Sequence, residues 1–283
     1  MEGETAERDA LSRLLLFGPG YTGERLAAAV EARGWTVARI GREKIGTVPL
    51  FEEAVRATHI LSTVPPDEDA GDPVLRRCRP ALVRAPRWIG HLSSTGVYGD
   101  TGGAWVDESA PVGLGRRSAR AAADRDWLSL GAHVFRLPGI YGPGRSPLNR
   151  VASGAAYRVD RPGQVFSRIH VDDIVAAVIA AFDAPPGAYN IADDEPAPQD
   201  EVTAYAARLL GAPLPPVVPL DSLPPAARGF YAENRRIANG RAKRLLGWRP
   251  LYPSYREGLR ALSATTSPAS VSAPPSAAVT DQR

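Results

Sequence analysis

The chain has 283 residues, of which 44% are hydrophobic and 23% charged, values typical of a soluble protein with a substantial core. The formal net charge is only +3, and no apolar run approaches the roughly 20 residues of a membrane span, so a membrane partner is not expected. A lone cysteine, Cys78, a polar start without a secretory pattern and four scattered histidines lead us to expect a cytoplasmic protein without disulfides or a metal site.

The first half of the sequence alternates short apolar runs with amphipathic segments. A helix is expected at 24–33, with Gly34 as its C-terminal cap. Strands are expected at 13–17, 36–40, 59–64, 87–92 and 133–137. Such alternation predicts an α/β fold with a doubly wound parallel sheet. After residue 139 prolines and glycines become frequent, around helices expected at 174–182 and 199–210.

A glycine-rich loop follows the first expected strand. Gly18-Pro19-Gly20-Tyr21-Thr22-Gly23 matches the pattern G-x-G-x-x-G, with a strand before it and a helix after it. Glycines at these positions allow a tight turn and let backbone N–H groups approach a pyrophosphate at the helix N-terminus. The alternative is a glycine-rich turn without a ligand. The context favours a dinucleotide-binding site and a Rossmann domain.

The end of the second strand bears on the choice of cofactor. NAD-binding folds usually place an acidic residue there, for the ribose 2′-hydroxyl, whereas this chain has Arg42. A forked guanidinium suits a 2′-phosphate, so NADP is favoured over NAD. Two alternatives stay open: Arg42 is a solvated surface residue, or Glu43 is the acid placed one residue late.

Later motifs extend this pattern over most of the chain. They are 91–99 (HLSSTGVYG), 107–111 (DESAP), 136–144 (RLPGIYGPG), 168–173 (RIHVDD) and 247–253 (GWRPLYP). Together with the glycine loop, they resemble the short-chain dehydrogenase/reductase superfamily in its extended, epimerase/dehydratase-like branch. Asp172 or Asp173 is expected to be the N-cap of a helix that begins at Ile174.

The resemblance implies roles for several residues. Ser94 takes the position of the serine that hydrogen-bonds the reacting oxygen, or it is a strand-end serine that bonds its own backbone. The nicotinamide pocket would be lined by the stretch that follows the fifth strand. The expected cofactor-binding residues are Gly18, Gly20, Tyr21, Thr22, Gly23, Arg42, Thr63, Val64, Pro65, Pro138, Gly139 and Ile140.

The acid–base motif of the superfamily, Tyr-x-x-x-Lys, is absent. Only Lys44 and Lys243 are lysines, and the residues four positions before them are Ile40 and Asn239. At the expected place Arg116 stands for the tyrosine and Arg120 for the lysine, and an arginine cannot act as a general acid. The candidate substitutes are two tyrosines that follow the strand ends, Tyr98 and Tyr141, although packing is the favoured explanation for each.

The leading hypothesis is an atypical NADP-dependent oxidoreductase or epimerase-like enzyme acting on a small carbonyl or hydroxyl substrate, as a monomer or homodimer. The alternative is a non-catalytic NAD(P)-binding sensor or regulatory protein. A basic stretch with aromatic residues at 228–249 also suits nucleic acid, which we consider unlikely at this net charge. We divide the chain into a flexible start (1–12), the Rossmann domain (13–138), a smaller, partly interleaved substrate-side region (139–262) and a disordered tail (263–283).

Overall fold

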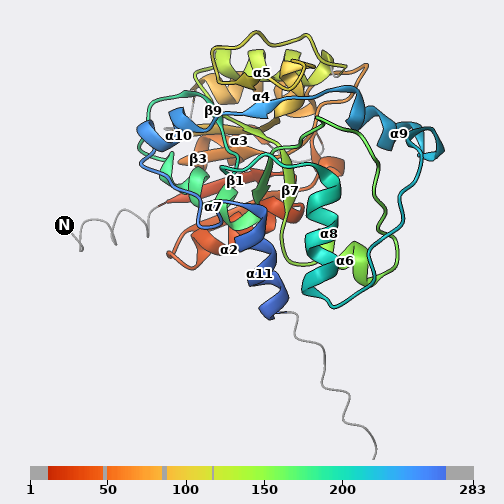
Figure 1. The fold of residues 1–283 in the computed structure, drawn as a ribbon. Helices are drawn as coiled ribbons and strands as arrows, with labels where there is room; N and C mark the ends of the chain where they lie inside the picture. The colour runs from red at the N-terminus through yellow and green to blue at the C-terminus, as the bar shows by residue number, and fades with distance from the viewer. Residues whose placement is uncertain (1–11, 47–49, 85–87, 117, 266–283) are drawn as a thin grey trace, which may run out of the picture.

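The computed structural model describes residues 12–46, 50–84, 88–116 and 118–265 (Figure 1). Within these residues the largest sheet has six parallel strands in the order β2-β1-β3-β4-β6-β9. The strands are β1 (Arg13–Phe17), β2 (Thr36–Ile40), β3 (His59–Ser62), β4 (Trp88–Ser94), β6 (His133–Leu137) and β9 (Gly187–Asn190). This is the predicted α/β class, and the first five strands lie within two residues of their predicted bounds.

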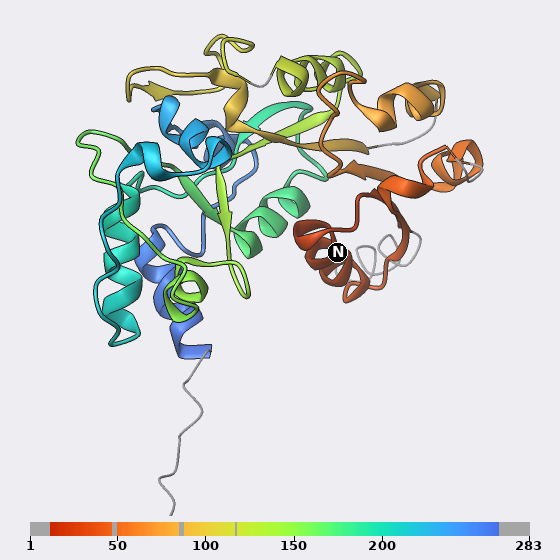
Figure 2. The same ribbon diagram turned by 90° about the vertical axis from the view of Figure 1, so that its right-hand side faces the viewer.

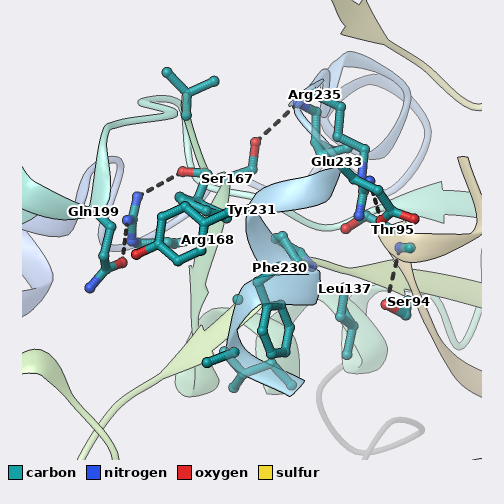
Figure 3. Close-up of a pocket in the computed structure, with 18 of the residues that line it drawn as sticks. Ser94, Thr95, Leu137, Ser167, Arg168, Gln199, Phe230, Tyr231, Glu233 and Arg235 are labelled. Carbon is teal, nitrogen blue, oxygen red and sulfur yellow. Dashed lines mark hydrogen bonds and ion pairs between the residues drawn. The ribbon is translucent and has the colours of Figure 1, made fainter. Parts of the chain in front are cut away.

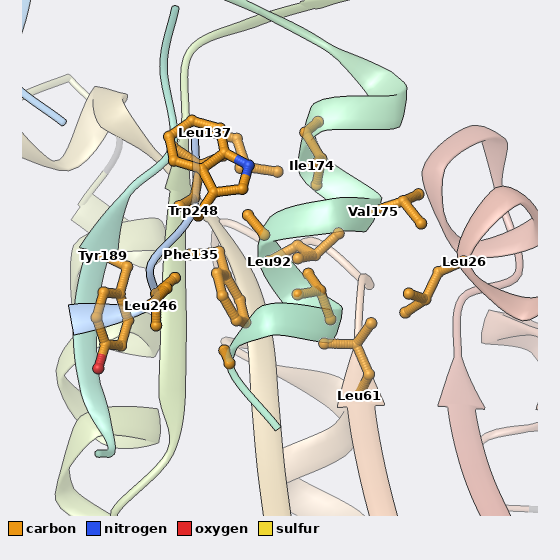
Figure 4. Close-up of a cluster of buried hydrophobic side chains, with 14 of the residues drawn as sticks. Leu26, Leu61, Leu92, Phe135, Leu137, Ile174, Val175, Tyr189, Leu246 and Trp248 are labelled. Carbon is orange, nitrogen blue, oxygen red and sulfur yellow. The ribbon is translucent and has the colours of Figure 1, made fainter. Parts of the chain in front are cut away.

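Helices cover both faces of the sheet (Figures 1 and 2). One face carries α2 (Tyr21–Glu31) and α7 (Val171–Ala180), and the other carries α3 (Leu50–Arg56), α4 (Pro73–Arg84) and α5 (Ser118–Ser129). Because successive strand residues point to opposite faces, β1 serves two cores. Its Leu14 and Leu16 pack with Leu26 and Ile174, in the cluster drawn in Figure 4. A strand buried on both faces reads as a continuous apolar run, which is why β1 was recognisable.

The order of the strands reverses at β1, which has β2 on one side and β3 on the other. In open α/β sheets, ligands bind beyond the carboxyl ends of the strands at such a reversal. The glycine loop 18–23 follows β1 at this point. Strand β2 pairs with β1 and lies at the edge of the sheet. Between β2 and β3 the described chain forms a short 3₁₀ turn (Arg42–Lys44) and α3.

The residues after 138 build a second layer beside the sheet (Figure 2). There β7 (Gly139–Tyr141) pairs with β8 (Arg168–His170), and α6 (Pro147–Ala152), α8 (Gln199–Leu209) and α11 (Tyr255–Thr265) pack together around an apolar cluster. The chain also returns to the main sheet, where β9 lies beside β6. Smaller elements are β5 (Trp105–Val106), β10 (Arg236–Ile237), α9 (Pro225–Arg228) and α10 (Gly240–Leu245).

Several helix starts and ends differ from the prediction. Helix α2 begins at Tyr21, three residues before the predicted start, because the glycine loop leads directly into its first turn, and its C-cap is Ala32 and not Gly34.

Helix α7 begins at Val171, and its N-cap is His170, whose Nδ1 accepts a hydrogen bond from the Asp172 N–H over 3.3 Å. The predicted aspartate cap is therefore wrong. Instead, the Asp173 carboxylate accepts hydrogen bonds from the backbone N–H groups of Leu251, at 2.6 Å, and Tyr252, at 3.2 Å. It thereby fastens the C-terminal segment to α7.

Helix α11 continues to Thr265, so the predicted tail boundary at 263 is wrong by three residues. Its Leu259 and Leu262 are buried against the second layer, which explains why the helix persists. The predicted flexible start and the rest of the tail lie outside the described residues, except for Ser12, whose carbonyl accepts a hydrogen bond from the Thr36 N–H. No helix among the described residues is long and apolar enough to cross a membrane.

Candidate active site

The three glycines of the loop have three different surroundings. Gly18 has φ +79°, and a Cβ there would meet Thr63 Oγ1 and Val64 Cγ2 at 2.8 Å. A Cβ on Gly23 would come within 2.9 Å of the Gly18 carbonyl, where α2 packs on β1. At Gly20 the nearest atom would be 3.9 Å away, so the backbone there stays open. The first turn of α2 also leaves N–H groups without helical partners. This loop fits a pyrophosphate.

The residues predicted beside the glycine loop brace it. Thr63 Oγ1 donates a hydrogen bond to the Gly18 carbonyl, and Val64 is buried. Tyr21 points the other way: its hydroxyl donates to the Pro143 carbonyl at 3.1 Å, and the guanidinium carbon of Arg145 lies 5.6 Å from its ring centroid. The loop is thus tied to the end of β3 and to the segment after β7.

Arg42 lies just beyond the end of β2, as predicted, but it is already engaged. Its Nη1 donates to Asp67 Oδ1 at 2.7 Å, and its Nη2 donates to the carbonyl of Pro65. The side chain remains 47% exposed. The Glu43 carboxylate folds back over Gly41, where a Cβ would clash with it at 2.3 Å. Both a cation and a carboxylate therefore border the position beyond β2 where a ribose would lie.

A cavity of about 640 Å³ opens beyond the carboxyl ends of β4 and β6 (Figure 3). Its lining includes six of the residues predicted from the sequence: Ser94, Arg116, Arg120, Pro138, Gly139 and Ile140. Ser94 ends β4, Arg116 precedes α5, Arg120 lies in α5, and the last three follow β6. Ser94 Oγ caps the following turn by accepting a hydrogen bond from the Gly96 N–H at 3.1 Å. Its hydroxyl nevertheless faces the cavity, next to Leu137 (Figure 3).

Arginine dominates the charge of this cavity. Among the described residues, six arginines line it, from α5, α6, β8 and the loops between elements: Arg116, Arg120, Arg145, Arg150, Arg168 and Arg235. Among the described lining residues the one acid is Glu233, which accepts hydrogen bonds from the Arg116 N–H at 3.1 Å and from Arg235 Nη1 at 2.9 Å. The cavity is therefore strongly cationic, although the whole chain is nearly neutral, and it suits an anionic ligand.

Tyr98 does not reach the cavity. Its hydroxyl donates to Asn190 Oδ1 at 2.7 Å and accepts from Arg136 Nη1 at 2.9 Å. Arg136 also forms a buried ion pair with Asp124 at 2.7 Å, and Asp124 accepts from Ser93 Oγ. Burial raises the pKa of the Tyr98 hydroxyl, so it holds its proton. This position supports the packing explanation for Tyr98.

Tyr141 is also packed away from the cavity. A Cβ on Gly258 would overlap its hydroxyl at 2.1 Å, and its ring meets His170 edge to face at 5.2 Å. Burial raises the pKa of this hydroxyl well above its usual value. Neither candidate substitute acid therefore faces the space where a substrate would bind.

Sequence reasoning missed the wall opposite Ser94. This wall includes Tyr157, Gln199, Phe230 and Tyr231, which belong to no motif of the family. Part of it belongs to the stretch 228–249 that we weighed as a nucleic-acid surface. In the structure its Phe230, Tyr231 and Arg235 line the cavity, and Trp248 is buried. The interleaving of aromatic and basic residues was the available signal, which we had weighed only for a nucleic-acid surface.

Comparison with solved structures gives close similarity over the whole fold. A functionally unknown conserved protein from Silicibacter pomeroyi DSS is 44% identical, with a TM-score of 0.80, over 90% of this chain and 99% of that chain. This chain belongs to the same family. MoeE5 in complex with UDP-glucose and NAD (19% identity, TM-score 0.75) and a human epimerase family protein with NADPH (16%, 0.67) share the fold, each over 89% of this chain. The fold is therefore that of the epimerase/dehydratase-like branch, as the motifs predicted.

One curated relative carries a specific name. A 3-diazoavenalumate denitrifying reductase from a Streptomyces species is 34% identical over 176 residues, which are 54% of this chain and 58% of the reductase. The match thus spans a little more than half the length of that relative. No protein-family model matches the chain.

Proposed function

We propose that this chain is a cytoplasmic NADP-dependent reductase that acts on a small anionic substrate without a tyrosine acid. The cofactor would lie along the glycine loop, with Arg42 beside its 2′-phosphate and Pro138–Ile140 beside its nicotinamide, where it would supply a hydride. The observation that carries the proposal is the cationic cavity around Ser94, with Arg116 and Arg120 in place of the usual acid–base pair.

The side chains of the cavity suit charge stabilisation better than proton transfer. Ser94 can donate a hydrogen bond to a substrate oxygen, and the two arginines can stabilise negative charge that develops there. Arginine cannot release a proton in this range of pH. Glu233 is engaged as an acceptor by Arg116 and Arg235. The substrate should therefore be one whose reduction leaves a stabilised anion or needs no proton from the protein.

The named Streptomyces relative suggests one such reaction. Replacing an arene diazonium group by hydride forms a C–H bond and breaks the C–N bond, whose electron pair leaves with N₂. No oxygen is protonated in that step, so the missing tyrosine would be no obstacle. An activated carbonyl acid is the alternative substrate class, because its alkoxide could be held by the arginines and protonated by water.

The test is NADPH oxidation by the purified protein with a set of arene diazonium carboxylates and activated 2-oxo acids. We expect turnover within one of these classes. If the substrate is a 2-oxo acid, kcat should fall by about 10²–10³ in Arg116→Gln or Arg120→Gln, because its alkoxide develops beside these arginines. Arg125→Gln, an exposed change outside the cavity in α5, the helix that carries Arg120, is the matched control. Tight NADPH binding with no turnover in either class would instead favour a non-catalytic sensor.

A further inference from the structure

One end of the cavity, away from Ser94, contains a buried arginine near Tyr231 (Figure 3). Arg168 comes from β8 and is 6% exposed, Tyr231 is 7% exposed, and Tyr157 lies between α6 and β8 in the chain. Figure 3 shows Arg168, Tyr231 and Gln199 together on one side, while Ser94 lies on the other. The cavity thus has two separate polar ends.

Arg168 has neutral hydrogen-bond partners. Its Nη1 donates to the carbonyls of Phe166, at 2.7 Å, and Ala197, at 3.0 Å, and its Nη2 donates to Gln199 Oε1 at 2.9 Å. No carboxylate of the described residues lies within ion-pair distance of it. Asp193 acts on it through space, but burial raises the pKa of that carboxyl well above its usual value, which favours the neutral acid. A buried cation whose direct hydrogen-bond partners are all neutral can gain a charge-assisted hydrogen bond from an anionic ligand.

Two tyrosines that line this part of the cavity carry hydroxyl donors. Neither Tyr157 nor Tyr231 makes a side-chain hydrogen bond to another described residue, although buried hydroxyls are usually paired. Burial raises the pKa of Tyr231 to about 12, so its hydroxyl keeps its proton at neutral pH. Tyr231 is close enough to Arg168 and to Tyr157 to interact electrostatically with both.

We propose that this end binds a carboxylate of the substrate, through the guanidinium of Arg168 and the hydroxyls of Tyr157 and Tyr231. A guanidinium and a carboxylate are geometrically complementary, and charge-assisted hydrogen bonds of this kind are strong. The single buried cation matches the single charge of a carboxylate better than the charge of a diphosphate. Arg150, stacked 5.1 Å from the Tyr157 ring centroid, is exposed at the rim.

The walls next to this end suit a flat carbon skeleton. Phe166 meets Tyr231 edge to face at 5.4 Å, and Ala156 and Val165 complete an apolar surface. With the carboxylate held at Arg168, the rest of a planar acid would extend through the cavity toward Ser94. The inference names the substrate class of the proposed reductase and rests on its assignment of this cavity to the substrate.

Binding can be tested without turnover. The protein saturated with NADP⁺ is titrated by calorimetry with benzoate and 4-hydroxycinnamate, with the corresponding amides, and with UDP. We expect at least one carboxylate to bind and its amide to bind at least tenfold more weakly. Arg168→Met should weaken the carboxylate at least tenfold, and Tyr157→Phe and Tyr231→Phe each by three- to tenfold. Arg208→Met and Tyr205→Phe, both outside the cavity lining, are the matched controls.

The outcomes separate this inference from the proposed function. Equal affinity for acid and amide, no binding of any carboxylate, or an affinity for UDP alone that depends on Arg168 would overturn the carboxylate site. Because Arg168 is buried, circular dichroism melting must show that its variant is folded. If it is not, the two tyrosine variants decide the matter. Carboxylate binding without NADPH oxidation would refute the reductase but leave this site in place.

Discussion

Arg42 Nη1 donates a hydrogen bond to Asp67 Oδ1 over 2.7 Å and so joins the loop after β2 to the loop after β3. Both side chains are more than two-fifths exposed, so the pair itself adds little stability. Its position matters more, because the carboxylate of Asp67 neutralises the guanidinium that we propose for the cofactor 2′-phosphate. A bound phosphate would have to compete with Asp67 for Arg42.

This competition gives the first prediction. Arg42→Ala should weaken NADP⁺ by roughly ten- to a hundredfold, as expected for the loss of a charge-assisted hydrogen bond, and leave NAD⁺ nearly unchanged. Asp67→Asn should strengthen NADP⁺ several-fold, since it frees Arg42 and removes a negative charge. Calorimetry of the three proteins with both cofactors measures these changes. Equal affinity of the wild type for NADP⁺ and NAD⁺ would refute the role of Arg42.

The second prediction concerns the buried network around Arg136. Asp124→Asn should lower the free energy of unfolding by about 3–5 kcal/mol, because it leaves the guanidinium, 3% exposed, without its countercharge. Tyr98→Phe should lower it by about 1–3 kcal/mol, because Asn190 loses a buried donor. Urea denaturation measures both changes, with Tyr205→Phe as a control outside the network.

The same Tyr98→Phe variant tests the role of Tyr98 in the reaction. Because the hydroxyl does not reach the cavity, we expect kcat to stay within about twofold of the wild type on any substrate found. A loss approaching the 10²–10⁴ typical of a general acid would restore Tyr98 as the substitute acid. Tyr141→Phe should likewise preserve kcat.

How far the sequence could predict this protein depends on how local each signal is. Strand β1 contains a continuous apolar run, Leu14 to Phe17, because both faces of a parallel sheet are buried, and such a run is visible without a partner. The glycine loop is recognisable as well, because the strand before it and the helix after it are adjacent in the sequence. Side chains that depend on distant partners were harder: Asp172 and Asp173 both suit an N-cap, and only the fold shows that Asp173 binds Leu251 and Tyr252 instead.

In the candidate site, too, the residues with local sequence signals were predicted and those that depend on distant contacts were not. Ser94 and the stretch 138–140 were identified because they follow strand ends within motifs of the family. Most of the opposite wall was missed because Tyr157, Gln199 and Tyr231 are separated by up to 74 positions and meet only after the second layer and the C-terminal segment have packed. Arg168 begins the motif 168–173, but its neutral hydrogen-bond partners depend on distant segments and have no sequence pattern of their own. Composition showed an excess of arginine but not where it gathers.

A third prediction follows from the histidine inside the sheet. His91 is almost fully buried, stacks on Trp127 at 5.2 Å, and has its pKa lowered to about 4 mainly by burial. The unfolded chain therefore binds a proton to this histidine below about pH 6.5, while the folded protein resists it. The free energy of unfolding should fall as the pH drops from about 6.5 to 4, and this part of the loss should disappear in His91→Phe.

Urea denaturation at several pH values measures this contribution. Each pKa unit between the folded and the unfolded state changes the free energy of unfolding by about 1.4 kcal/mol. The fall in stability caused by His91 should therefore exceed the error of the denaturation measurement. Asp72 and Asp124 oppose the shift, and a smaller effect would indicate that their charges outweigh burial. If wild type and His91→Phe lose stability in parallel over this range, the histidine does not titrate as described.

The last prediction is that the wild type does not convert common nucleotide sugars. Oxidation or epimerisation of a sugar hydroxyl requires a base at that oxygen, which typically contributes about 10²–10⁴ in rate. The cavity offers Arg116 at the place of the tyrosine, and Ser94 alone is too weak a base without an activated neighbour. Turnover assays with UDP-glucose and dTDP-glucose and both cofactors should therefore give negligible conversion.

Two variants show whether the missing acid–base pair is the reason. The double change Arg116→Tyr, Arg120→Lys restores the usual residue types at positions that both line the cavity with Ser94. Measurable conversion by this variant alone would mean that the pair was the barrier. Continued inactivity would place the barrier in substrate binding, as the carboxylate site predicts. Fast conversion by the wild type, lost in Ser94→Ala, would mean that another group moves the proton and that the arginines do not define the chemistry.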